Sequence, residues 1–134
     1  MKYKQILLTR PPTGSNLLQG GTDKDPYPQP PLGLAYIAAV LEQASHTVQM
    51  IDIDADNISK EDFIKILSDS KPDLVGITAT TPTVTKAIEI SKDIKNNSSA
   101  YTVIGGVHPT LKYREVVSNE TIDFVIKGEG ERTV

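Results

Sequence analysis

Short apolar runs alternate with longer amphipathic segments along this chain of 134 residues. The run from Leu74 to Ile77 has no polar alternation, which is typical of a strand covered on both faces. It leads into small hydroxyl residues and then Pro82, which suits the first turn of a helix. The predicted strands occupy residues 5–9, 48–53, 74–78, 101–104 and 124–126.

Helical patterns fill the segments between these strands. Residues 32–44 are apolar nearly all round, so we expect this helix to be substantially buried. Ser59 and Asp62 form a capping-box-like pair ahead of a second helix. A third helix carries an apolar stripe from Val84 to Ile94, and Pro109 can open a fourth.

Strands that alternate with helices indicate βαβ units with right-handed crossovers. The sequence therefore predicts one α/β domain over residues 1–134, with a five-stranded parallel sheet and helices on both faces. We expect the strand Leu74–Thr78 to lie beside the first strand, near the centre of the sheet. Neither an internal repeat nor a linker between domains is apparent.

Composition narrows the function classes. A hydrophobic content of 38% and a charged content of 23% describe an ordinary globular domain, and a net charge of -3 provides no basic footprint for nucleic acid. No apolar run approaches the roughly 18 residues of a membrane helix. Because the N-terminus leads into a strand and not a signal peptide, a cytoplasmic location is expected. Without cysteine and with two histidines, the chain offers no disulfide, iron–sulfur or multi-histidine metal site.

Three predicted loops should converge at the carboxyl edge of the sheet, where open parallel sheets bind ligands. They cover residues 9–16, 78–83 and 105–110. The paired glycines in the third loop allow close backbone approach to a ligand or supply positive φ for a turn. The candidate ligand contacts from these loops are Thr9, Pro11, Thr13, Gly14, Thr78, Thr80, Thr81, Gly105, Gly106 and His108.

Simpler interpretations of these residues stay open. Thr81 or Thr83 can serve only as a helix cap, and His108 can contact ligand or cap the helix at Pro109. His46 precedes the second strand on the amino edge, so we interpret it as structural. The segment 11–31, which holds six of the nine prolines, is either a ligand-covering lid or a flexible connection.

Conventional nucleotide sites fit poorly. The first strand is followed by Arg-Pro-Pro-Thr-Gly at 10–14 instead of Gly-x-Gly-x-x-Gly, and a Walker A motif is absent. Asp52 could bind a ribose, but without the glycine loop it is only weak support for a dinucleotide site. Residues 13–16 faintly suggest a flavin phosphate loop, while two phenylalanines, five tyrosines and no tryptophan leave few aromatic rings to sandwich a flavin.

An ordered set of segments resembles the cobalamin-binding domain that precedes many radical S-adenosylmethionine enzymes, such as the anaerobic oxidative cyclase of magnesium-protoporphyrin monomethyl ester. The resemblance covers most of the chain, from Leu7 to Thr133. The segments that carry it are PLGLAYIAAVLE (31–42), HTV (46–48), ID (51–52), DLVGIT (73–78), GGVHPT (105–110) and DFVIKGEGE (123–131).

This resemblance implies a flavodoxin-like, Rossmann-like sheet of order 2-1-3-4-5, with the cobalamin nucleotide tail entering along its carboxyl edge. By position, Thr78 and Thr80 match the hydroxyl-bearing segment that lines the tail. Gly105 and Gly106 match the glycines that let the tail pass close to backbone, and Gly128 in the last segment joins the candidate contacts. Cobalamin domains that donate a histidine to cobalt carry Asp-x-His-x-x-Gly after the first strand. Here no histidine precedes His46, so we expect no protein histidine on cobalt.

The leading hypothesis is therefore a cobalamin-binding module of a radical enzyme of the oxidative cyclase or methyltransferase type. The alternatives are a domain of the same ancestry that gates substrate or binds a partner without cobalamin, and a flavin mononucleotide electron carrier. We expect an excised N-terminal domain, inactive alone, whose 4Fe-4S cluster and S-adenosylmethionine belong to a missing C-terminal barrel. An apolar surface near the fifth strand should be exposed, and a homodimer is one way of covering it.

Overall fold

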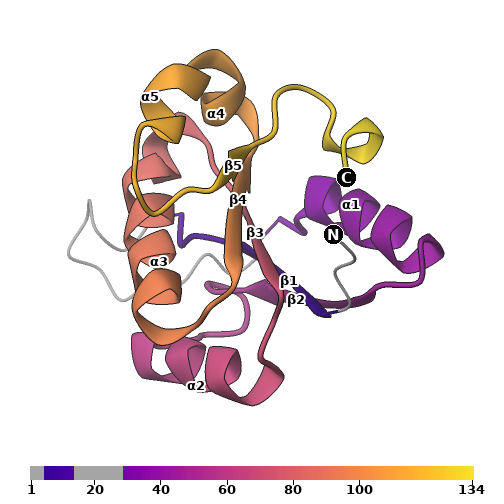
Figure 1. The fold of residues 1–134 in the computed structure, drawn as a ribbon, viewed down its shortest axis with the longest axis vertical. Coiled ribbons are helices and arrows are strands. Elements are labelled where there is room, and N and C mark those ends of the chain that lie inside the picture. The colour runs from indigo at the N-terminus through magenta and orange to yellow at the C-terminus, as the bar shows by residue number, and fades with distance from the viewer. Residues whose placement is uncertain (1–4, 14–28) are drawn as a thin grey trace.

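The computed structural model describes residues 5–13 and 29–134 (Figure 1). The candidate contact Gly14 lies outside the described residues. The same holds for most of the segment 11–31, so the expectation of a lid there stays a prediction.

One parallel sheet of five strands, in the order β2-β1-β3-β4-β5, forms the centre of the described structure. This confirms the predicted α/β fold, the strand order and the place of β3 beside β1. Every strand boundary lies within one residue of its predicted position. The strands are β1 (Gln5–Arg10), β2 (Thr47–Asp52), β3 (Leu74–Thr78), β4 (Tyr101–Gly105) and β5 (Phe124–Val125).

Helices cover the two faces of this sheet unequally (Figure 1). The helix α1 (Leu32–Gln43) lies on one face, whereas α2 (Lys60–Ser70) and α3 (Val84–Asn97) lie on the other. The short C-terminal turn η2 (Gly130–Arg132) packs against α1. The remaining elements are η1 (Thr81–Thr83), α4 (Val107–Leu111) and α5 (Tyr113–Val117).

The face that carries α2 and α3 is closed by a continuous apolar core. Val75 and Ile104 contribute from the sheet, Leu67 from α2 and Ile94 from α3, and each is at most 1% exposed. Alternation along the strands explains why Val75 and Ile104 share this face, since every second side chain of a strand points to the same face. The closed face therefore contains most of the buried apolar side chains of the described structure.

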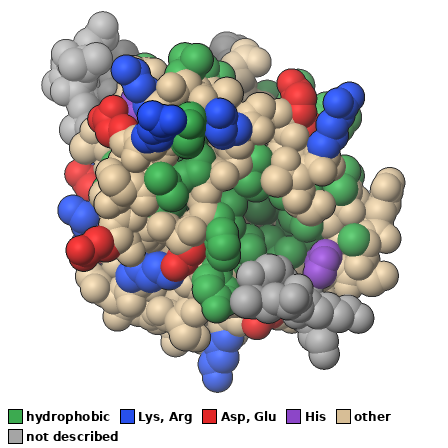
Figure 2. All heavy atoms as spheres, turned by 45° about the horizontal axis from the view of Figure 1, so that its top comes forward, with side chains coloured by type: hydrophobic (Ala, Val, Ile, Leu, Met, Phe, Trp, Pro, Cys, Tyr) green, Lys and Arg blue, Asp and Glu red, His purple; other side chains and the backbone are tan. Residues whose placement is uncertain are grey.

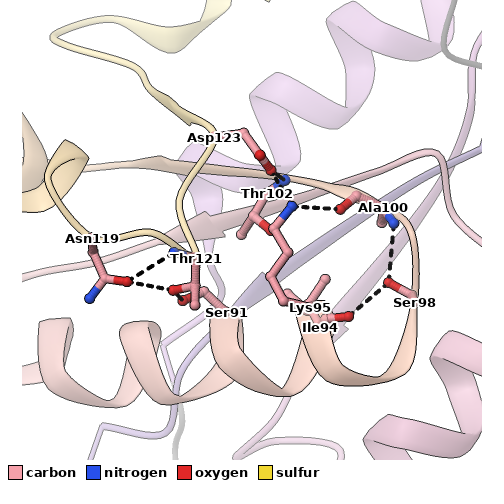
Figure 3. A network of polar contacts seen from close by, with 9 residues as sticks. All are labelled: Ser91, Ile94, Lys95, Ser98, Ala100, Thr102, Asn119, Thr121 and Asp123. Carbon is pink, nitrogen blue, oxygen red and sulfur yellow. Dashed lines mark hydrogen bonds and ion pairs between the residues drawn. The ribbon is translucent and has the colours of Figure 1, made fainter.

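A polar network ties α3 to the amino ends of β4 and β5 (Figure 3). The Asp123 carboxylate accepts hydrogen bonds from the Thr102 backbone N–H (2.6 Å) and the Lys95 ammonium (2.5 Å). Lys95 also donates to the Ala100 carbonyl (3.2 Å). Because the carboxylate and the ammonium are each only partly exposed, they form a charge-assisted pair that fixes the edge of the sheet.

The capping box predicted at the start of α2 is present. The Asp62 backbone N–H donates to the Ser59 hydroxyl oxygen (3.1 Å), and the Ser59 N–H donates to the Asp62 carboxylate (3.2 Å). Hydrogen bonds from the Ser59 side chain and backbone hold the pKa of Asp62 below its ordinary value of 3.8. The boundary of α2 was therefore readable from local sequence alone.

One helix expectation is wrong, and a second holds only in part. The helix α1 is not substantially buried, because Leu34 and Leu41 face the sheet while Leu32 and Tyr36 are each 65% exposed. An all-round apolar pattern predicts burial only if neighbours exist on every side, and none of the described elements covers the outer side of α1. Pro109 lies in the first turn of a helix as expected, but this helix begins at Val107 and is divided at residue 112 into α4 and α5.

Candidate functional site

A groove of about 700 Å³ runs along the sheet face that carries α1. Figure 2 shows a hollow in the surface whose floor consists of hydrophobic side chains. One wall is α1 and the opposite side is β5, while the segment 126–134 crosses from β5 to α1, where η2 packs (Figure 1). The groove exists because α1 covers only β1 and β2, and no described helix covers the remainder of this face.

The floor of the groove is a set of rows across the sheet. Leu8, Gly76, Val103 and Phe124 are register partners on β1, β3, β4 and β5, and we call them the middle row. A deeper row toward the amino edge contains Ile6 and Leu74. The row at the carboxyl edge contains Thr78 and Gly105.

The loops after β3 and β4 meet at the carboxyl end of the groove, which we call the mouth. The Ala79 N–H donates to the Gly105 carbonyl (2.8 Å), and the His108 N–H donates to the Ala79 carbonyl (3.3 Å). The structure thus brings Thr78, Gly105 and Gly106 together, as the sequence predicts, and all three line the groove.

The two adjacent glycines at the mouth serve different physical purposes. Gly106 has φ 110°, and a Cβ on it would lie 2.5 Å from the Ala79 carbonyl oxygen. A Cβ on Gly105 would instead meet Ile126 Cβ at 3.7 Å, an ordinary van der Waals contact. Gly106 is therefore required by the backbone of its own loop, whereas Gly105 leaves free space inside the groove.

All six glycines in residues 5–13 and 29–134 line this groove: Gly33, Gly76, Gly105, Gly106, Gly128 and Gly130. Positive φ accounts for Gly106 and Gly128, and close side chains account for Gly76 and Gly130. Gly33 has no such reason, since a Cβ there would meet nothing within 4 Å. Gly33 is the second residue of α1, and packing within the described structure does not explain a glycine at this position.

The hydroxyl-rich loop after β3 is tied both to itself and to the next loop. The Thr80 N–H donates to the Thr83 hydroxyl oxygen (3.0 Å), which stabilises the turn η1. His108 Nδ1 and Thr81 Oγ1 lie 3.1 Å apart and form a hydrogen bond across the two loops. Gly106 and not His108 is therefore the N-cap of α4. The Thr81 hydroxyl bonds the imidazole of His108 and does not act only as a helix cap.

The candidate contacts from the first loop lie apart from the groove. Thr9 is fully buried on the closed face, and Pro11 is also buried. The backbone N–H and the hydroxyl of Thr13 both donate to the Asp54 carboxylate, at 2.7 and 2.8 Å. No observation tests their roles as ligand contacts, so these stay predictions.

Asp52, considered above as a ribose ligand, is already bound at the end of β2. Its Oδ2 lies 2.6 Å from the Arg10 guanidinium, and its Oδ1 accepts a hydrogen bond from the Ala55 N–H (3.3 Å). Both members of the ion pair are largely buried. The pair therefore fastens the carboxyl ends of β1 and β2 together.

Gly128 is connected to the mouth through one side chain. The Thr110 hydroxyl donates to the Gly106 carbonyl (2.7 Å), and its oxygen accepts a hydrogen bond from the Gly128 N–H (3.0 Å). The C-terminal segment then continues along the groove, which Glu129 and Glu131 also line. The structure therefore brings Gly128 near the double glycine, and its role as a ligand contact stays a prediction.

Sequence analysis missed several residues of the groove. The middle row could have been found by stepping back two positions from Thr78 and Gly105, because side chains two apart share a strand face. Gly33 carried the only signal in α1, a glycine inside a helical pattern. His46 lies on the amino edge as expected, yet it lines the deep end of the groove, because the groove extends along the length of the sheet.

Among residues 5–13 and 29–134, no group of three or more histidine, aspartate and glutamate side chains converges as a metal site. Within the same residues, no helix has the length and apolar character that crossing a membrane requires.

The B12 binding domain family matches residues 20–134 of the chain. This chain belongs to that family. The family match confirms the resemblance that the ordered sequence segments carry.

Relatives with this domain are considerably longer proteins. The chain is 41% identical over 140 residues to an uncharacterized methyltransferase of Pyrococcus horikoshii. This match covers 99% of this chain and 28% of that protein. It is 34% identical over 110 residues to the anaerobic magnesium-protoporphyrin IX monomethyl ester cyclase of Rubrivivax gelatinosus, covering 78% of this chain and 20% of that protein. The chain thus spans under a third of the length of these relatives.

Solved structures share the fold. The radical S-adenosylmethionine methyltransferase TsrM of Kitasatospora setae, with cobalamin and a 4Fe-4S cluster bound, superposes with a TM-score of 0.78 at 22% identity. The match covers 98% of this chain and 23% of TsrM. The cobalamin-dependent radical enzyme OxsB, with aqua-cobalamin and S-adenosylmethionine bound, gives a TM-score of 0.76 at 21% identity over 97% of this chain and 17% of OxsB.

Proposed function

We propose that this chain is the corrinoid-binding domain of a longer radical S-adenosylmethionine enzyme, and that its groove holds the nucleotide tail of cobalamin. The observation that carries the proposal is an apolar groove of about 700 Å³ lined by six glycines in a B12 binding domain. Glycines without a packing reason, Gly33 and Gly105, leave backbone accessible where a bound group can lie against it.

The distribution of polarity along the groove supports this fit. Thr78 and the loop backbone lie at the mouth, while the middle row beyond them is apolar. A nucleotide tail has the same order, with a phosphate and a ribose nearest the corrin ring and an aromatic base at its end. Polar groups at the mouth and apolar side chains inside therefore match the tail in the direction in which it enters.

We propose that no histidine of this chain coordinates cobalt. His108 lies at the mouth, and its Nδ1 is engaged with Thr81. His46 lies at the opposite end of the groove, beside the start of β2. With the tail in the groove, the lower face of the corrin ring would lie over the loops after β3 and β4, which present threonine, glycine and His108.

Catalysis would reside elsewhere in the parent protein. The chain has no cysteine, so a 4Fe-4S cluster and the S-adenosylmethionine bound to it would belong to a separate barrel. The exposure of Phe124 (46%) and Tyr101 (37%) supports the expected apolar surface beside β5. We propose that this surface contacts the rest of the parent protein, with a homodimer of the domain as the alternative. The reaction would be of the methyltransferase or oxidative cyclase type, as the printed names of the relatives indicate.

The experiment compares the binding of hydroxocobalamin with that of cobinamide, which has the corrin ring but no nucleotide tail. Purified protein is mixed with each corrinoid and desalted, and the dissociation constants are measured by equilibrium dialysis. We expect retained colour with hydroxocobalamin and an affinity at least about tenfold higher than that of cobinamide, because only the former places a tail in the apolar groove.

A matched pair of α1 variants locates the site. Gly33→Leu adds a side chain to open space in the groove and should weaken cobalamin binding by about tenfold or more without loss of folding, since leucine favours a helix over glycine. Ala39→Leu adds the same side chain to an exposed position of α1 that does not line the groove, and should leave binding unchanged. Equal binding of the two corrinoids, or no effect of Gly33→Leu, would overturn the proposal in favour of a domain that acts without bound cobalamin.

A further inference from the structure

We infer that the groove selects among corrinoids by the lower base at the end of the tail, accepting benzimidazole-type or phenol-type bases and rejecting adenine. The inference rests on the proposed function, because it concerns the ligand of the same groove. It goes further by naming the chemical class of corrinoid that the domain takes.

The first observation is where polar side chains lie. The polar residues that line the groove are His46 at its deep end, Thr78 at the mouth, and Glu129, Glu131 and Thr133 in the segment after β5. Within the described structure, the middle row and the α1 residues that line the groove with it carry no hydrogen-bonding side chain. The part of the groove between the middle row and α1 therefore presents only carbon atoms and backbone to a bound base.

The second observation is the shape of the floor. Gly76 lies between Leu8 and Val103 in the middle row, and its missing side chain leaves room there for the side chain of Leu8. Leu8 Cδ2 fills this room, since it would lie 2.7 Å from a Cβ on Gly76. A flat aromatic ring over the centre of the middle row would therefore rest on the side chains of Leu8 and Val103.

Distance along the strand separates this ring position from the nearest hydroxyl. Thr78 follows Gly76 by two residues, which is about 6.6 Å along a strand, whereas a hydrogen bond needs about 3 Å. Glu129 follows β5 and is exposed, and Glu131 lies in η2, which packs against α1. The side chains of the middle row and of α1 therefore offer no hydrogen-bond partner to polar atoms of a base that lies between them.

The bases of natural corrinoids differ in this respect. Dimethylbenzimidazole and p-cresol bury methyl and aromatic carbons and carry no amino group. Off cobalt, dimethylbenzimidazole loses the hydrogen bond to water of one ring nitrogen on entry, and p-cresol has no ring nitrogen. Adenine carries an exocyclic amino group and two further ring nitrogens that would be desolvated without a partner. Leaving such a group unpaired weakens binding by about 5- to 100-fold.

The test measures the dissociation constants of cobalamin, its adenine-tailed analogue and cobinamide for the same purified chain. We expect cobalamin to bind at least about fivefold more tightly than the adenine analogue, because the amino group is left unpaired. If cobalamin and cobinamide bind equally, the tail does not enter the groove and the proposed function itself fails. If cobalamin exceeds cobinamide but equals the adenine analogue, the proposed function stands and the inferred selectivity is overturned.

A substitution in the middle row tests the physical cause. Val103→Thr keeps the shape of the side chain and adds a hydroxyl within the groove, so the ratio between cobalamin and the adenine analogue should fall by about 2- to 10-fold. Val48→Thr is the control, since Val48 is a half-buried strand residue on the same sheet face that does not line the groove. An unchanged ratio in a folded Val103→Thr variant, or an equal change in the control, would remove the middle row as the selecting surface.

Discussion

Adjacent residues of the same strands form two very different surfaces. Val75 and Ile77 of β3 point into the core beneath α2 and α3, whereas Gly76, between them, lies on the floor of the groove. The closed face contains leucine, isoleucine and phenylalanine packed to near-zero exposure. The face that carries α1 has a smaller cluster of Ile6, Leu8, Leu34 and Leu41, with every described glycine beside it.

This difference indicates a division of roles. Buried apolar area drives folding, so the closed face should supply most of the stability of the domain. The open face has exposed backbone and apolar side chains that the described residues leave uncovered, which is the composition of a binding surface. The same sheet can therefore hold a rigid core and an accommodating groove, because strand alternation keeps the two sets of side chains apart.

Core truncations on the two faces should give the largest contrast. Ile94→Ala on the closed face removes a side chain with no exposure, so the free energy of unfolding should fall by about 2–5 kcal/mol. Ile37→Ala on α1, where the isoleucine is half-buried and lines the groove, should cost about 1 kcal/mol or less. Urea denaturation measures both values, and similar losses would show that the two faces share the stability equally.

Substitutions of the paired glycines at the mouth compare a glycine that the backbone requires with one that leaves space in the groove. Gly106→Ala should lower the free energy of unfolding by about 1–3 kcal/mol, because the residue has φ 110° and its Cβ would meet the Ala79 carbonyl. Gly105→Ala should change it by less than about 0.5 kcal/mol while weakening cobalamin binding, since its methyl enters the groove. The reverse order of stability would contradict the different roles of the two glycines.

Removal of the Ser59 cap measures how much the start of α2 contributes to the stability of the closed face. Ser59→Ala should lower the free energy of unfolding near neutral pH by about 1 kcal/mol. The hydrogen bonds from Ser59 lower the pKa of Asp62, so their stabilising effect is complete above the ordinary pKa of 3.8 and is lost as the pH falls through the lowered value. Carboxyl NMR titration should show the pKa of Asp62 rising in the variant, and an unchanged titration would disprove this cause.

The hydrogen bond between the two mouth loops should have the smallest effect. Thr81→Val removes the hydroxyl that bonds His108 and should lower the free energy of unfolding by about 0.5–1 kcal/mol, because the bond is exposed to solvent. Thr85→Val, at an exposed position of α3, is a matched control with little expected change. A thermal denaturation midpoint that falls equally in both variants would show that the bond across the loops contributes nothing measurable.

Local sequence determined much of this molecule. The uninterrupted apolar run at Leu74 to Ile77 located the central strand, and the Ser59–Asp62 pair located the start of α2, because these features depend on residues a few positions apart. The order of strands and helices then brought the loops after β3 and β4 to one edge, which placed Thr78, Gly105 and Gly106 together. Family membership was also readable from the order of the motifs.

Tertiary structure alone decided which surfaces are covered. Alternation along a strand predicts that Gly76 and Val75 point to opposite faces, but it does not specify which face a helix will close. The exposure of Leu32 and Tyr36, the retention of Thr13 by Asp54, and the groove itself depend on where distant elements pack. The difference between Gly105 and Gly106 has the same origin, because the atom that forbids a side chain on Gly106 belongs to Ala79, in the loop after a neighbouring strand.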